Sequence, residues 1–125
     1  MKMYCLDTSI VIDLLKGDEE LFLKLDSIDE KFFISPITMF ELFKGTIDEN
    51  EINVIEDMLS EFRILEFSID VSKTFGELFK NLKSSGRMIP ESDLMIVAFV
   101  KLYDLIFVTR DRKHFENVGV KVEYW

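Results

Sequence analysis

The chain has little of the residue types that build covalent or membrane-bound frameworks. Its 125 residues include one cysteine, Cys5, which excludes an internal disulfide and a cysteine-rich zinc site. The longest unbroken apolar run, residues 94–100, is far shorter than the roughly 20 residues that span a bilayer. Asp7 and Asp13 interrupt the apolar N-terminus. We therefore expect no signal peptide, no membrane partner and a cytoplasmic location.

Positive charge is also scarce. The chain has 15 Lys and Arg against 24 Asp and Glu, a net charge of −9, which argues against a general affinity for nucleic acid. The charge is uneven, because residues 1–62 hold 5 basic and 15 acidic residues, whereas residues 63–125 hold 10 and 9. A polyanion is therefore expected to contact mainly the second half.

The chain does contain alternating strand and helix patterns. Apolar or alternating segments predict strands at 2–6, 31–35, 63–67, 105–109 and 120–124. Helical spacing predicts helices at 8–17, 18–28, 36–45, 48–61, 68–86 and 91–103. This alternation predicts an α/β fold with helices on both faces of a mostly parallel sheet of four to five strands. The length suits a single domain over residues 1–125.

Caps and side-chain directions follow from the same patterns. The predicted caps are polar residues at helix starts: Thr8 or Ser9, Ser35 followed by Pro36, and Ser68 or Asp70. Helical spacing places Phe22 and Phe40 on inward faces. Cys5, in the first strand, is interpreted as a small buried apolar filler. Asp13 and Asp104 are interpreted as solvated or capping groups.

Four carboxylates stand near element ends. Asp7 follows the first strand, and Asp111 comes two residues after Thr109, which ends the fourth. Asp93 lies in the first turn of helix 91–103, and Glu41 lies in the second turn of helix 36–45, beside its apolar stripe. Ligands of open parallel α/β sheets bind beyond the carboxyl ends of the strands. We therefore expect the four acids to converge at one edge of the sheet.

Such convergence requires compensation of negative charge. Two carboxylates about 4 Å apart at an effective dielectric constant of about 20 repel each other by about 4 kcal/mol. The acids must share protons or surround a cation, and ligand oxygens with open positions suit Mg²⁺ or Mn²⁺. Such an ion lowers the pKa of a bound water, orients it toward a phosphodiester and stabilises the leaving oxygen. Spacing alone leaves caps and surface charges as the alternative, since the chain has 24 acids.

Blocks of sequence around these acids occur in a characteristic order. They are LDTSIVIDLLKG (6–17), ISPITMFELFKG (34–45), IPESDLMIVA (89–98) and FVTRDRKHF (107–115), followed by the ending VKVEYW. Their order and spacing resemble the PIN-domain family, and within it the VapC-type toxins of toxin–antitoxin pairs. The resemblance covers essentially the whole chain, and the ordered set is specific although no single block is.

The resemblance implies a PIN-like three-layer α/β/α fold and a metal-dependent endoribonuclease that leaves a 5′-phosphate and a 3′-hydroxyl. The family's four acids, which are its metal ligands and catalytic groups, fall on Asp7, Glu41, Asp93 and Asp111. Its supporting hydroxyls fall on Thr8 or Ser9 and on Thr109, where they would bond the carboxylates or metal-bound waters. The implied cofactor is Mg²⁺, with Mn²⁺ as a substitute. The implied partners are RNA, a second copy of the chain and a small antitoxin that occludes the site.

This chain departs from the family pattern at two points. It is more acidic than many VapC-like chains, and it has His114 where some carry a further acid three residues after the fourth. We predict one firmly held ion and leave a second ion open. His114 is interpreted as a surface hydrogen-bonding group, with an acid–base role as the alternative. Glu91, two residues before Asp93, is an additional candidate for a contact with metal or water.

A basic loop next to the fourth acid is the candidate substrate contact. Arg110, Arg112 and Lys113 surround Asp111 in the sequence, and phosphate contact by these residues would offset the acidic first half. The alternative is a solvated turn. Most Phe residues are expected in the core, but some Phe and Leu side chains of the first three helices are candidates for a dimer or antitoxin surface, and the sequence does not separate these two uses.

Two rival functions each lack a residue that they require, and a third stays open. A phosphatase of the haloacid dehalogenase type needs a second acid two residues after Asp7, where the chain has Ser9. A receiver-like signalling domain needs an aspartate after a central third strand, and no such pair is present. A catalytically silent PIN-like module that binds RNA or protein stays open, although all four acids are intact.

Overall fold

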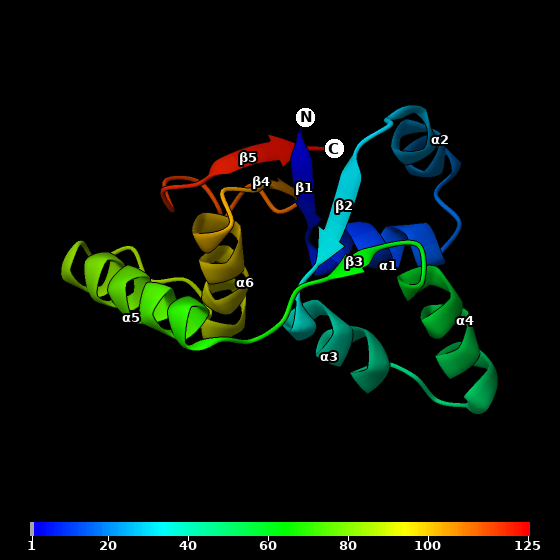
Figure 1. The fold of residues 1–125 in the computed structure, drawn as a ribbon, viewed down its shortest axis with the longest axis horizontal. Coiled ribbons are helices and arrows are strands. Elements are labelled where there is room, and N and C mark those ends of the chain that lie inside the picture. Colours follow the sequence, from blue (N-terminus) through cyan, green and yellow to red (C-terminus); the bar gives the residue numbers. More distant parts are fainter. Residues whose placement is uncertain (1) are drawn as a thin grey trace.

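The computed structural model describes residues 2–125, arranged around a five-stranded, all-parallel sheet (Figure 1). The strands follow the order β3-β2-β1-β4-β5, and their bounds are β1 Met3–Leu6, β2 Lys31–Ile34, β3 Arg63–Ile64, β4 Ile106–Thr109 and β5 Lys121–Tyr124. The central strand β1 therefore pairs with β2 on one side and with β4 on the other. The predicted α/β class and sheet are confirmed, and every strand pair is parallel.

Helices cover both faces of the sheet, because both faces are apolar. Cys5 and Phe107 face a core built with α5 (Ile69–Ser84) and α6 (Glu91–Leu102). Leu6 and Val108 face the opposite core, built with α1 (Thr8–Leu15), α2 (Glu19–Ser27) and α4 (Glu49–Leu59). Figure 1 shows these two helical layers on either side of the strands. The three-layer arrangement predicted from the family resemblance is confirmed.

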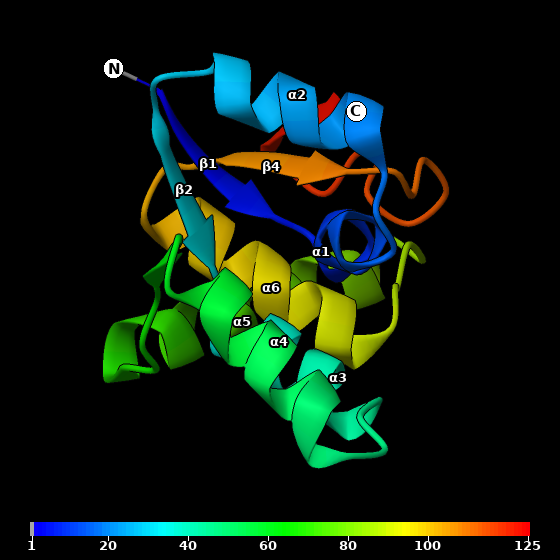
Figure 2. The same cartoon turned by 90° about the vertical axis from the view of Figure 1, so that its right-hand side faces the viewer.

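Helix α3 (Pro36–Lys44) lies at one end of the sheet and contributes to both cores. Its Ile37 packs with the α5–α6 core and its Leu42 packs with the α1–α2–α4 core. Figure 2 shows β1 and β4 pointing toward the end of the sheet where α1 begins. The carboxyl ends of the two central strands therefore meet the first turns of helices at one edge.

The caps agree with the sequence in two of three cases. Ser35 and Ser68 accept hydrogen bonds from the third residue of α3 and of α5, and Pro36 occupies the first position of α3. The prediction that Thr8 or Ser9 caps the first helix is wrong. Asp7 is the cap, and its side chain accepts the Thr8 N–H. The extended backbone of β1 continues through Asp7, and the helix begins at Thr8, the first residue of the predicted range, so only the cap lies one residue earlier than predicted.

Two other predictions need correction. The predicted strand 63–67 shrinks to Arg63–Ile64, because the chain turns away toward α5 after the Leu65 N–H has bonded Ile34 O. Phe22 and Phe40, predicted to face inward, are 59% and 65% exposed. Neighbouring residues occupy the inward faces instead: Leu21 on α2, and Ile37 and Leu42 on α3.

The remaining sequence expectations concern Cys5 and membranes. Cys5 is fully buried, and this burial raises the pKa of its thiol, so it fills space in the core as predicted. Among residues 2–125 the structure has no helix with the length and apolar character needed to cross a bilayer.

Candidate metal centre at the carboxyl edge of the sheet

The candidate centre is built on the pairing of β1 with β4. Leu6 lies opposite Val108, and the Asp7 N–H donates to Val108 O at 2.8 Å, so Asp7 comes next to Thr109. Thr109 Oγ1 donates to Asp7 Oδ2 at 2.6 Å and accepts the Asp111 N–H at 3.0 Å. One buried hydroxyl therefore joins the first and fourth acids, 104 residues apart in the chain.

Asp7 is the most buried of the four acids, with 6% of its surface exposed. Its Oδ1 accepts the Thr8 N–H at 2.8 Å, and its Oδ2 accepts the hydroxyls of Thr109 and of Ser9, the latter at 3.1 Å. Burial raises the pKa of this carboxyl, and the hydrogen bonds oppose that rise. Asp7 thus caps α1 and enters the acidic site with the same carboxylate.

Glu41 is oriented by a chain of hydroxyls. Thr8 Oγ1 donates to Glu41 Oε1 at 2.7 Å and lies 3.0 Å from Thr38 Oγ1. Because the single Thr8 proton goes to Glu41, the proton between the two threonines must come from Thr38. Thr38 is fully buried and also lies 3.5 Å from Ser35 Oγ. Ser35 thus donates a hydrogen bond to Thr38, Thr38 donates one to Thr8, and Thr8 donates one to the Glu41 carboxylate.

Asp93 and Asp111 meet at the same edge together with His114. One ligand atom from each of these three residues lies within 4.8 Å of the other two. The pKa of Asp93 is raised to about 6, mainly by burial and also by the negative charges of Asp7, Glu41 and Asp111, whereas His114 opposes the rise. Because the other three acids all raise the pKa of Asp93, the four carboxylates form one electrostatic cluster.

The groups present fit a divalent cation. The carboxylates supply anionic oxygens, and the first turn of α6, which carries Asp93, has no side-chain cap. His114 Nδ1 is a buried atom without a hydrogen-bond partner among the described residues, although Asp111 Oδ2 lies 2.7 Å away. An orphaned nitrogen beside anionic oxygens is a donor set for a metal ion. Glu91 is exposed and is not part of the group formed by Asp93, Asp111 and His114.

The basic loop is placed differently from the acids. Arg110 Nη1 pairs with Asp13 Oδ2 at 2.8 Å and with Asp18 Oδ2 at 2.9 Å, and its Nε donates to Trp125 O at 2.7 Å. Asp13 lies in α1 and Asp18 caps α2, so these contacts tie both helices to the C-terminal residue. The Asp13 side chain is one-third exposed, as expected for a solvated group, and also forms this ion pair. The guanidinium of Arg112 lies over the Tyr124 ring at 4.3 Å.

Sequence reasoning missed some members of this site. His114, interpreted as a surface hydrogen-bonding group with an acid–base role as the alternative, lies beside Asp93 and Asp111, and its spacing of three residues from Asp111 is a signal that both side chains can meet. The sequence pattern assigns no role to Thr38, although its position midway between the Ser35 cap and Glu41 is the available signal. Asp18 was predicted only as the start of a helix. Lys113 is exposed, and its N–H donates to Asp111 Oδ1 at 2.9 Å.

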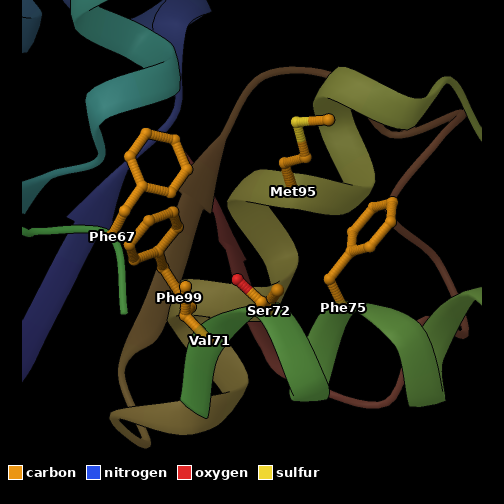
Figure 3. A pocket seen from close by; sticks show the side chains of 7 residues that line it. Phe67, Val71, Ser72, Phe75, Met95 and Phe99 are labelled. Carbon is orange, nitrogen blue, oxygen red and sulfur yellow. The ribbon is translucent and has the colours of Figure 1, made fainter. Parts of the chain in front are cut away.

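Two apolar hollows lie outside the acidic cluster. One, of about 150 Å³, opens between α5 and α6 and is lined by no charged residue; Figure 3 shows Phe67, Phe75 and Met95 around it. The other, of about 500 Å³, is lined by apolar side chains of α1, α2, β2 and α4 and by two acids, Asp26 and Glu61.

Comparisons with known proteins agree on one family. The sequence profile of the PIN domain matches residues 4–121. The chain is 34% identical to "Ribonuclease VapC2" of Haemophilus influenzae, over 100% of this chain and 99% of that one. It is 28% identical to "tRNA(fMet)-specific endonuclease VapC" of Shigella flexneri, with the same coverage. The structure of DNA-bound VapBC from Salmonella typhimurium superposes with a TM-score of 0.93 at 25% identity, covering 100% of this chain and 99% of that chain.

Proposed function

This chain belongs to the PIN-domain family, and we propose that it is a divalent-metal-dependent endoribonuclease, the toxin of a toxin–antitoxin pair. The observation that supports the metal-dependent chemistry most directly is the convergence of four carboxylates. The negative charges of Asp7, Glu41 and Asp111 all raise the pKa of Asp93. No Lys or Arg of the described residues forms an ion pair with any of the four.

We assign the metal to Asp7, Glu41, Asp93 and Asp111, as Mg²⁺ with Mn²⁺ as a substitute. When bound, an ion of this kind polarises water for attack on a phosphodiester and stabilises the charge on the leaving oxygen. The protein's own part is positioning. Thr109 and Ser9 orient Asp7, and Thr8 orients Glu41, so the carboxylate oxygens are fixed before substrate arrives.

The RNA must approach a molecule with a net charge of −9. Arg112 and Lys113 are exposed beside Asp111 and are the proposed phosphate contacts. Arg110 adds positive charge to the same loop, but its guanidinium already serves Asp13, Asp18 and Trp125 O. We therefore expect Lys113→Ala to weaken RNA binding without altering cleavage chemistry. We expect the protein to act in the cytoplasm.

The two apolar hollows suit two different protein partners. The α5–α6 surface has no charged lining and continues through exposed Phe67 to Phe40, whose rings lie 6.5 Å apart. We assign this surface to a second copy of the chain. Two copies carry the same net negative charge, and no charged residue lines this surface to repel its counterpart. The hollow on α1, α2 and α4 carries Asp26 and Glu61 and belongs to the acidic half, so we assign it to a basic segment of the antitoxin.

Cleavage of RNA tests the catalytic assignment. The purified chain is incubated with total RNA in EDTA, in Mg²⁺ and in Mn²⁺, and the cut ends are mapped. We expect internal cuts with 5′-phosphate and 3′-hydroxyl ends only when an ion is present. Asp7→Asn should abolish cleavage while keeping the circular dichroism spectrum, because Asn also caps a helix well. Asp57→Asn, on the exposed face of α4, is the matched control and should cut normally.

The outcomes separate the competing functions. A chain that binds RNA but leaves it intact with Mn²⁺ present would be the catalytically silent module. Full activity of Asp7→Asn would show that the site is misassigned.

Paired substitutions test the partner surfaces. Phe67→Glu should convert the dimer to a monomer in light scattering while leaving binding of the co-expressed antitoxin intact. Phe22→Glu, in the acidic hollow, should do the reverse. If Phe67→Glu prevents antitoxin binding and Phe22→Glu prevents dimer formation, the two surfaces have been assigned to the wrong partners. A wild-type chain that is monomeric at concentrations well above 10 µM would rule out the dimer.

A further inference from the structure

His114 is the only histidine of the chain, and its nitrogen faces two of the proposed metal ligands. Nδ1 lies 2.7 Å from Asp111 Oδ2 and 3.3 Å from Asp93 Oδ2. The atom is buried and has no hydrogen-bond partner within the described part of the chain, so neither short contact has hydrogen-bond geometry. A buried nitrogen that is close to two anions without a hydrogen bond to either needs another explanation.

Both separations from the nitrogen fit neighbouring ligands of one ion. Adjacent ligands of an octahedral ion, each about 2.1 Å from the metal and at right angles, lie about 3.0 Å apart. The two measured separations, 2.7 and 3.3 Å, stand on either side of that value. Each carboxylate oxygen is therefore spaced from the nitrogen as a neighbouring ligand of one ion would be, and one ligand atom from each of the three residues lies within 4.8 Å of the other two.

The loop that carries His114 is fixed without help from an ion. Asp111 Oδ1 accepts the N–H groups of Lys113 at 2.9 Å and of His114 at 3.1 Å, which closes a tight turn and leaves Oδ2 for the site. The next residue, Phe115, is 1% exposed and packs edge-on against Phe107 of β4 at 4.7 Å between ring centroids. The turn and this aromatic anchor together set the position of the imidazole.

We propose that His114 Nδ1 binds the divalent ion directly with Asp93 and Asp111, and that it makes the site prefer Mn²⁺ and later first-row ions over Mg²⁺. The proposal rests on the metal-dependent nuclease proposed above. Its physical reason is that Mg²⁺ favours shells of oxygen only, whereas imidazole nitrogen binds transition ions more strongly along the first-row series. The rival explanation is a protonated imidazole that only balances the charge of the two carboxylates.

Because the chain has a single histidine, any imidazole nitrogen that a spectrum detects on the metal must belong to His114. The chain is prepared without a histidine tag and loaded with Mn²⁺, and electron spin echo spectra are recorded. We expect a coupling from a directly bound ¹⁴N that is replaced by the ¹⁵N pattern when the protein is labelled with ¹⁵N-histidine. His114→Asp, which keeps a ligand but supplies oxygen, should lose the coupling and still bind Mn²⁺. Glu116→Gln, an exposed neighbour, is the control and should keep the coupling.

Metal selectivity provides a second readout. Calorimetric titration with Mn²⁺ and with Mg²⁺ gives the ratio of the two affinities, and we expect His114→Asp to lower that ratio by about tenfold or more. Bound Mn²⁺ without nitrogen coupling, an unchanged ratio, or no Mn²⁺ binding by the wild-type chain would overturn the proposal. Failure of the nuclease proposal is recognised separately, because the wild-type chain would then cut no RNA with either ion.

Discussion

Asp93→Asn is expected to stabilise the metal-free protein at neutral pH, although it removes a proposed metal ligand. Burial, together with the charges of Asp7, Glu41 and Asp111, raises the pKa of Asp93 from 3.8 to about 6. The folded protein therefore holds a proton on this carboxyl more tightly than the unfolded chain does. Ionising Asp93 at pH 7 costs folding free energy, and asparagine avoids that cost.

The size of the effect follows from the pKa difference. Each pKa unit corresponds to about 1.4 kcal/mol, so a difference of about two units sets an upper bound of about 3 kcal/mol. The side chain is 21% exposed, and we expect solvent screening to leave about 1–2 kcal/mol. The penalty is absent below the unfolded pKa of 3.8, grows as the pH rises, and is complete once the pH exceeds the folded pKa of about 6.

Urea unfolding in EDTA at pH 4.5 and pH 7.5 measures this difference. Asp93→Asn should exceed the wild type by about 1–2 kcal/mol at pH 7.5, and most of this gap should vanish at pH 4.5. Asp57→Asn, which changes the same charge on an exposed face, should show little gap at either pH. Added Mn²⁺ should stabilise the wild type more than the variant, because the ion binds the folded site. A gap of equal size at both pH values would refute the placement of Asp93 among the other acids.

Three further substitutions or treatments probe the surroundings of the site. Thr109→Val removes the buried hydroxyl that bonds Asp7 and should lower the free energy of unfolding by about 1–3 kcal/mol and weaken Mn²⁺ binding; an unchanged urea midpoint would contradict this role. Arg110→Ala frees the C-terminal residue, so the emission of Trp125, the only tryptophan, should shift to the red; an unshifted spectrum would show that the clamp is dispensable. Cys5 should react with thiol reagents only as fast as the protein unfolds, and rapid labelling of the native chain would contradict its burial.

The sequence carries the placement of the acids at strand ends because parallel strands impose it. Asp7 and Asp111 follow residues of β1 and β4, and neighbouring parallel strands end at the same edge of a sheet. No knowledge of side-chain contacts is needed for that step. The layers were predictable for the same reason, since apolar strands that alternate with helices require cover on both faces.

The sequence does not carry contacts that depend on the third dimension. The position of Arg110 beside Asp111 in the sequence predicts a phosphate contact. Its ion pairs with Asp13 and Asp18 depend on where α1 and α2 lie in the fold, which the sequence does not show. Phe22 and Phe40 are spaced like core residues, yet the core is already filled by their neighbours. Helical periodicity distinguishes an apolar face from a polar one, but it does not show whether the cover is the same chain or a partner.

The supporting contacts of the acids favour the proposal that a cation binds among them. A protein that kept four carboxylates together by itself would place Lys or Arg between them, as it does where Arg110 bridges Asp13 and Asp18. Around Asp7 and Glu41 the chain supplies hydroxyls instead: Thr8 for Glu41, and Ser9 and Thr109 for Asp7. Hydroxyl groups orient carboxylates without cancelling their charge, so the negative potential is retained for a cation. Replacing Thr8 by Val should therefore reduce the affinity for the metal, although this substitution leaves the net charge unchanged.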